Sequence, residues 1–151
     1  MSKPGRSVLC ALVAAIVGAG CGGGEEEKPL SKADYIAKGD ASCKKSIKRI
    51  ATAAEKDFAA LGSDEMPSEK QLTTFVEDTL KPEIEGQVSD LRDLEPPEGD
   101  GDKLAEIYEG VDEALRRVED DPGLLLEAGE DPFEKANQAV KEYGFKECGE
   151  S

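Results

Sequence analysis

Apolar residues along most of the chain recur every three or four positions, which is the spacing of one face of an α-helix. The first such face predicts a helix that begins at Ser31, where Ser31 and Asp34 have the form of a capping box, and that ends at Gly62. Gly39 interrupts the face. A helix that tolerates a glycine is the favoured interpretation, and a close contact with another backbone or a ligand is the alternative. The apolar positions of this helix are Ile36, Cys43, Ile47, Ile50, Ala54, Phe58 and Leu61.

A second helix is predicted to start at Ser68, which has the form of another capping box with Gln71, and to end at Pro96-Pro97. Apolar residues keep the helical spacing through this segment. Pro82 lies inside it, where proline removes one backbone hydrogen bond and clashes with the preceding turn. The sequence therefore predicts a second helix that is kinked at Pro82 or divided there into two abutting helices.

A third helix is predicted to begin within residues 98–102, where acidic residues and glycines precede a new apolar face. A short segment opened by Asp121-Pro122 follows it. The apolar face of the third helix contains Leu104, Ile107, Tyr108, Val111, Leu115 and Val118.

The last helix is predicted to have Asp131 as its N-cap and Pro132 at its first position, and to end at Gly144. Phe145 then lies where a residue after a glycine stop packs back on Val140. No segment alternates apolar and polar residues in the way that predicts a β-strand. The sequence therefore predicts an all-α protein, a small helical bundle of about four main helices with short connections.

Composition and charge limit the partners of this bundle. Asp and Glu number 34 against 19 Lys and Arg, so the formal net charge is −15. This charge excludes nucleic acid as a partner, because phosphate binding needs a basic face. An acidic surface attracts cations and basic partners, although it also serves simply to keep a protein in solution. A low content of aliphatic residues together with a high net charge is typical of disordered chains. Here the apolar residues recur at helical spacing, which favours a folded domain with a thin core.

The N-terminus has the parts of an export signal. Lys3 and Arg6 precede an uncharged run, residues 8–20, that is too short to span a bilayer, which needs about 20 residues. The run ends in small residues directly before Cys21, and this arrangement resembles the lipobox of bacterial lipoproteins. In a lipobox a diacylglyceryl group is attached to the cysteine and the signal is cut off before it. Gly18 departs from the pattern, which has a larger aliphatic residue there, so ordinary secretion with an unlipidated Cys21 is the alternative.

Three parts of the chain are predicted from these features. Residues 1–20 are the signal peptide, residues 21–30 are the lipidated cysteine and a flexible Gly/Glu-rich tether, and residues 31–151 are the helical domain. The lipid bilayer is then a partner through palmitate or similar acyl chains on Cys21, since two chains anchor a protein stably where one does not. The expected location is the extracytoplasmic face of the cell membrane.

Cys43 and Cys148 are the cysteines that remain as a pair after export, since Cys10 leaves with the signal and Cys21 carries the lipid. An even pair in an oxidising compartment predicts a disulfide. Cys43 lies on the apolar face of the first helix, and the turn at Gly144 directs Cys148 back toward the bundle. The alternative is a pair of buried free thiols.

Candidate chemistry is scarce in this chain. It has no histidine, which removes the Ser-His and Cys-His nucleophile systems and the usual zinc and haem sites. Nothing singles out two of the 34 carboxylates for glycoside hydrolysis. We therefore expect no enzyme activity, no cofactor and no metal site. Calcium at Asp100-Gly101-Asp102 with Glu95 and Glu98 is the alternative, but these residues lack the spacing of an EF-hand and equally suit an acidic helix start.

Several short motifs make the chain similar to the small uncharacterised lipoproteins that are common in high-GC Gram-positive bacteria. The resemblance implies an envelope location and a helical domain with paired cysteines, and it implies no substrate. The motifs are Gly20-Cys21 with its tether, Tyr35-Ile36, Ala41-Ser42-Cys43, Leu94-Glu95-Pro96-Pro97 and Tyr143-Gly144-Phe145-Lys146-Glu147-Cys148-Gly149.

Two functions from different classes fit these features. The anchor, the tether and the lack of catalytic residues favour a non-enzymatic binding or accessory module of the cell envelope, with a protein or a cell-wall component as partner. The alternative is a small-ligand carrier with a cavity between helices, beneath the kink at Pro82. A carrier should have a closed apolar pocket of several hundred Å³, whereas an interaction module should have a packed core and an exposed apolar patch.

Overall fold

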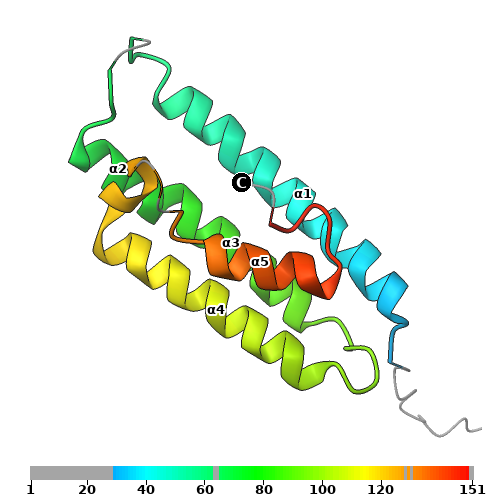
Figure 1. Ribbon diagram of the computed structural model, residues 1–151. Helices are drawn as coiled ribbons and strands as arrows, with labels where there is room; N and C mark the ends of the chain where they lie inside the picture. Colours follow the sequence, from blue (N-terminus) through cyan, green and yellow to red (C-terminus); the bar gives the residue numbers. More distant parts are fainter. Residues whose placement is uncertain (1–28, 63–64, 128, 130, 150–151) are drawn as a thin grey trace, which may run out of the picture.

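The computed structural model of the protein describes residues 29–62, 65–127, 129 and 131–149, and in that part the chain forms helices and no strand (Figure 1). The helices run alternately up and down, with α2 and α3 on one continuous path, so the predicted all-α bundle is confirmed. The predicted signal peptide and most of the tether lie outside the described residues. The elements are α1 (Lys32–Asp57), α2 (Glu69–Phe75), a π-helical turn (Val76–Leu80), α3 (Lys81–Arg92), α4 (Gly101–Asp120), a 3-10 helix (Pro122–Leu126) and α5 (Glu134–Tyr143).

Serine side chains cap the first two helices, as predicted. The Ser31 hydroxyl accepts a hydrogen bond from the N–H of Asp34 at 3.1 Å and donates one to the Asp34 carboxylate at 2.6 Å. At Ser68 the capping box is complete, because the Ser68 hydroxyl accepts from the N–H of Gln71 and the Gln71 side chain accepts from the N–H of Ser68. Each cap satisfies backbone donors that the first turn of a helix leaves unpaired.

Helix α1 ends at Asp57, and the prediction that it continues to Gly62 is wrong. The N–H of Phe58 makes the last helical hydrogen bond, to the carbonyl of Ala54 at 3.0 Å. The ring of Phe58 lies 5.3 Å from the ring of Phe75, measured between centroids. The chain leaves the helix where Phe58 meets this partner on α2, and that contact is invisible to local sequence rules.

The predicted interruption at Pro82 takes the form of a π turn. Residues Val76–Leu80 form one wide turn, and the N–H of Lys81 donates to the carbonyl of Val76 instead of a carbonyl four residues back. Pro82 is then the second residue of α3. A wider turn moves carbonyl groups away from the proline ring, which explains why the helical path continues past a residue that normally breaks it.

Helix α5 begins later than predicted but ends as predicted. Asp131 accepts the N–H of Phe133 at 2.8 Å, so Asp131 caps a turn and the helix itself begins at Glu134. At the other end Gly144 has φ of 121°, and the N–H of Phe145 donates to the carbonyl of Val140 at 3.3 Å. This is the geometry of a Schellman stop, and it buries Phe145 in the same cluster as Val140.

The disulfide between Cys43 and Cys148 is present, so the predicted pairing is confirmed. The two Cα atoms lie 5.1 Å apart, and 105 positions separate the residues in sequence. Both cysteines are buried in the larger of two apolar clusters, whose other buried members are Tyr35, Val88, Leu91, Leu104, Ile107, Tyr108, Val140, Tyr143 and Phe145. The smaller cluster, toward the other end of the bundle, contains Phe75, Val76, Leu80 and Val118.

Gly39 lies where α1, α3 and the C-terminal tail meet. A Cβ atom at this position would overlap the ring of Phe145 and lie 2.8 Å from the Cδ2 atom of Leu91. Glycine is needed here because a side chain would prevent Phe145 and Leu91 from packing this close to the backbone of α1. The interpretation of Gly39 as a tolerated glycine is therefore wrong. Gly39 marks a close contact, but the contact is with side chains and not with another backbone or a ligand.

Replacing Gly39 with alanine is expected to lower the free energy of unfolding by about 1–2 kcal/mol, because the cost of overpacking exceeds the gain in helix propensity. Gly86→Ala is the matched control, since Gly86 is also inside a helix and a Cβ there meets nothing within 4 Å. That variant should gain about 0.5–1 kcal/mol. Urea unfolding followed by circular dichroism measures both changes, and equal stabilisation by the two variants would contradict the close packing at Gly39.

Candidate binding groove

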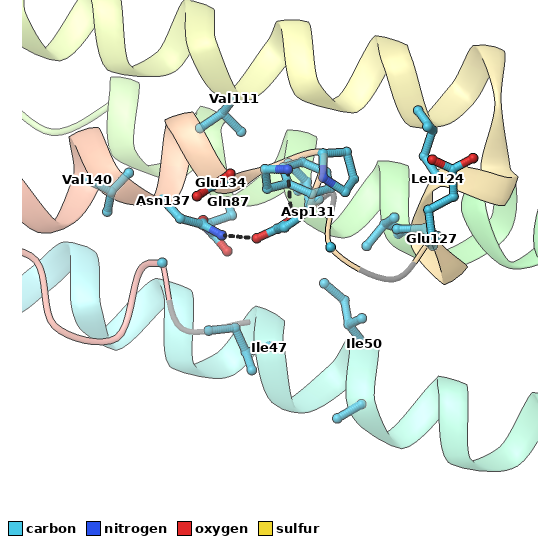
Figure 2. Close-up of a pocket in the computed structure, with 18 residues that line it drawn as sticks. Ile47, Ile50, Gln87, Val111, Leu124, Glu127, Asp131, Glu134, Asn137 and Val140 are labelled. Atoms are coloured by element: carbon cyan, nitrogen blue, oxygen red, sulfur yellow. Dashed lines mark hydrogen bonds between the residues drawn. The ribbon is translucent and has the colours of Figure 1, made fainter.

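An apolar groove with a volume of about 850 Å³ lies between α1 on one side and the 3-10 helix and α5 on the other (Figure 2). Ile47 and Ile50 on α1 point across it toward the segment that contains Asp131 and Asn137. The apolar side chains that line the groove are Ile47, Ile50, Ala51, Leu80, Ile84, Val111, Leu124, Leu125, Pro132, Phe133 and Val140.

The groove exists because α1 and α5 pack on different neighbours. Helix α1 packs mainly on α3, whereas α5 packs mainly on α4. Ile47 and Ile50 therefore remain only half-buried, although the sequence pattern places them on the core face of α1. Since packed interiors leave few voids, partly covered apolar side chains around a space of this size indicate room for a ligand.

The groove lies near the interruption at Pro82, although Pro82 itself does not line it. Leu80 and Ile84 lie on either side of Pro82 in sequence, and both line the groove. The groove is open to solvent along one side, whereas a closed pocket was expected of a carrier. Leu124 and Leu125 form part of the far wall, and each is half-buried.

The polar groups of the groove are concentrated in one segment of the chain. The lining includes the carboxylates of Glu127, Asp131 and Glu134, and no Lys or Arg is among the lining residues that the structure describes. The Asp131 carboxylate already accepts two hydrogen bonds, from the N–H of Phe133 and from the side-chain amide of Asn137 at 3.3 Å (Figure 2). In the described part of the chain the side chains of Glu127 and Glu134 form no ion pair or hydrogen bond.

The C-terminal tail is held to α1 by a carboxylate that sequence reasoning missed. One oxygen of Asp40 accepts the N–H groups of Lys146 at 2.9 Å, Glu147 at 2.9 Å and Cys148 at 3.4 Å. Backbone donors of an irregular segment need such an acceptor when they approach a core. The signal in the sequence was an aspartate beside Gly39 on the otherwise apolar side of the helix.

The hydroxyl groups of the tyrosines lie in or at the edge of the larger cluster. Tyr35 donates to the carbonyl of Leu91 at 3.0 Å, so the Tyr108 hydroxyl is the donor in the hydrogen bond between Tyr108 and Tyr35. Tyr143 donates to the carboxylate of Asp100 at 2.7 Å. Burial raises the pKa of all three phenols, and for Tyr143 the hydrogen bond to Asp100 raises it further. These phenols are held neutral and are poorly suited to act as bases or nucleophiles.

The residues considered for calcium do not converge on a site. Asp100 precedes α4 and is engaged by the Tyr143 hydroxyl and by the Lys32 ammonium, whose nitrogen lies 3.7 Å from the carboxylate. Across residues 29–62, 65–127, 129 and 131–149, no three Asp, Glu, Cys or His side chains come together as metal ligands. The Asp100 side chain makes no capping hydrogen bond to α4 and instead holds Tyr143 and Lys32, while Asp102 lies in the first turn of the helix.

The predicted lipid-attachment residue, Cys21, lies outside the described residues. Among the helices that are described, none has the length and apolar character needed to cross a membrane. Searches for related proteins returned nothing: no protein-family model, no curated protein and no solved structure matches the chain. The function must therefore be argued from the groove and from the sequence features that precede the bundle.

Proposed function

We propose that the protein is an extracytoplasmic lipoprotein, anchored to the cell membrane through Cys21, whose helical domain binds a small apolar ligand in the groove. The observation that carries the ligand-binding part is the groove of about 850 Å³, with its apolar walls contributed by every helix of the bundle except α2. This volume falls in the range of small-molecule sites. The anchored location rests on the signal-like N-terminus and its resemblance to a lipobox.

The groove favours a carrier over a module that docks a protein or a cell-wall component. On the described surface the exposed large apolar side chains are Met66 and Leu126, and they do not line the groove. Leu80 of the π turn and Ile84 and Gln87 of α3 line the groove, and the stretch from Leu80 to Gln87 corresponds to roughly 10 Å of helix at about 1.5 Å per residue. That length suits a small molecule better than a docked helix, which spreads its apolar anchors over several turns.

Binding without catalysis is the activity that these residues support. The chain has no histidine, and Cys43 and Cys148 are joined in a disulfide. The three tyrosines are buried, and their raised pKa values keep them protonated near neutral pH. None of these groups lines the groove.

Blocking the groove tests this proposal. The chain carrying Cys21→Ser, which removes any acyl chain of its own, is titrated with decyl amphiphiles below their micelle-forming concentrations, and binding is measured by calorimetry. Ala51→Phe places a ring in the groove and should weaken binding at least about ten-fold, since it occupies the apolar space that the ligand needs. Ala37→Phe is the matched control, because Ala37 is an exposed alanine of the same helix that does not line the groove. Absence of binding by every amphiphile, or equal effects of the two variants, would refute ligand binding in the groove.

Lipidation of Cys21 is tested separately. Mass spectrometry of the processed protein should find a diacylglyceryl group on an N-terminal Cys21. Cys21→Ser should leave the protein unprocessed or released from the membrane, because the anchor then has no sulfur to attach to. An unmodified N-terminus at any other residue would contradict the anchor and leave the groove proposal untouched.

A further inference from the structure

We infer that the ligand of the groove is a cationic amphiphile, with its apolar chain inside the groove and its positive head group beside the carboxylates of Glu127, Asp131 and Glu134. This inference rests on the proposed function and adds the charge of the ligand to it. Its basis is the distribution of apolar and acidic side chains around one cavity.

The walls of the groove differ in chemistry. Ile47, Ile50 and Ala51 form an apolar wall on α1, whereas all three carboxylates come from the stretch of chain between Glu127 and Glu134 on the opposite side (Figure 2). An amphiphile that enters the groove can therefore bury its chain against α1 and keep its head group on the acidic side, where Glu134 and Glu127 lie toward opposite ends (Figure 2). Burial of the chain supplies the affinity, at about 25 cal/mol for each Å² of apolar surface removed from water.

The negative charge on the acidic side of the groove determines which head group binds best. Of the described side chains that line the groove, three are carboxylates and none is basic. No Lys or Arg pairs with Glu127 or Glu134 in the described part of the chain, so both remain able to face a cation. An anionic head group would meet these carboxylates and the formal net charge of −15, and like charges repel. Electrostatic complementarity therefore favours a cation over an anion or a neutral head group.

Three probes that share one alkyl chain separate the contribution of the head group to affinity from that of the alkyl chain. Decyltrimethylammonium, decyl maltoside and decanoate are titrated below their micelle-forming concentrations into the chain that carries Cys21→Ser. The cation should bind roughly three- to five-fold more tightly than the maltoside, as one solvent-exposed charge pair provides, and decanoate should bind most weakly. The preference should shrink at high ionic strength because such a pair is screened.

A charge-neutralised groove tests which residues are responsible. Glu127→Gln with Glu134→Gln should reduce the ratio of the two affinities, cation over maltoside, to less than about two-fold. Glu69→Gln with Glu95→Gln is the matched control: Glu69, like Glu134, is the first residue of a helix, and Glu95, like Glu127, lies in an exposed connection. This control should keep the full preference.

Two further probes test whether the preference for the cation depends on the apolar chain and on a small ligand. Tetramethylammonium, the head group without a chain, should show no saturable binding; comparable affinity would mean general attraction of cations and would overturn the inference. A basic amphipathic peptide that competes with decyltrimethylammonium and binds more tightly than decyltrimethylammonium itself would also overturn the inference, in favour of a protein partner. Equal binding of all three decyl compounds would refute the cationic ligand while leaving the proposed function intact, whereas binding of none would refute both.

Discussion

Removing the Cys43–Cys148 disulfide is expected to lower the free energy of unfolding by about 5 kcal/mol. The bond closes a loop across 105 positions, and in the chain-entropy model a loop of about 100 residues gives roughly 4.7 kcal/mol. The total free energy of unfolding of a domain of this size is only about 5–15 kcal/mol. The protein without the bond should therefore be near the limit of folding, with its C-terminal tail the first part to detach from α1.

The measurement is urea unfolding of the native protein, of the reduced protein and of a Cys43→Ala, Cys148→Ala double variant, each followed by circular dichroism. Alanine is used because both sulfur atoms are buried, and a serine hydroxyl there would add the cost of a buried polar group. The reduced protein and the double variant should agree to within about 1 kcal/mol. A loss below about 1 kcal/mol in both would show that the packing of the tail, including the Asp40 contacts, is sufficient by itself.

Raising the pH above about 10 is expected to unfold the bundle cooperatively. The chain has three tyrosines, Tyr35, Tyr108 and Tyr143, and all are buried with their pKa values raised, chiefly by burial. A phenol whose pKa is higher in the folded state stabilises the fold fully below its unfolded pKa of about 10, and that stability is lost as the pH rises from there toward the folded pKa. Each tyrosine contributes about 1.4 kcal/mol per pH unit in this window, so three together contribute about 4 kcal/mol per pH unit.

Absorbance at the tyrosinate wavelength and circular dichroism, recorded in one alkaline titration, test this directly. The two signals should change together in a single transition, whereas in concentrated urea the phenols should ionise near pH 10 without any such coupling. Tyr108→Phe keeps the ring and removes one ionising group, so the slope of stability against pH should fall by about a third. Tyrosinate absorbance that rises near pH 10 while the helical signal is retained would contradict the buried hydroxyl network.

Local features of the sequence predicted most of the helices and their limits. Ser31 and Ser68 cap their helices because a side-chain oxygen reaches backbone donors only two or three residues away. Gly144 stops α5 because it adopts a positive φ that other residues resist. The pairing of Cys43 with Cys148 was also predictable, because the predicted export signal and the number of cysteines left few alternatives. Each of these effects depends on neighbours in the chain or on chemistry that composition reveals.

Only the tertiary structure decided the features that depend on which segments meet. Gly39 is required because Phe145 and Leu91 close on it, and Asp40 holds the tail because residues more than a hundred positions away approach it. The groove has the same origin: Ile47 and Ile50 carry the pattern of core residues, yet α5 packs on α4 and leaves them half-covered. The spacing of apolar residues in the sequence predicts which face of a helix is apolar. The distance between that helix and its neighbours then determines whether the face is buried or lines a binding site.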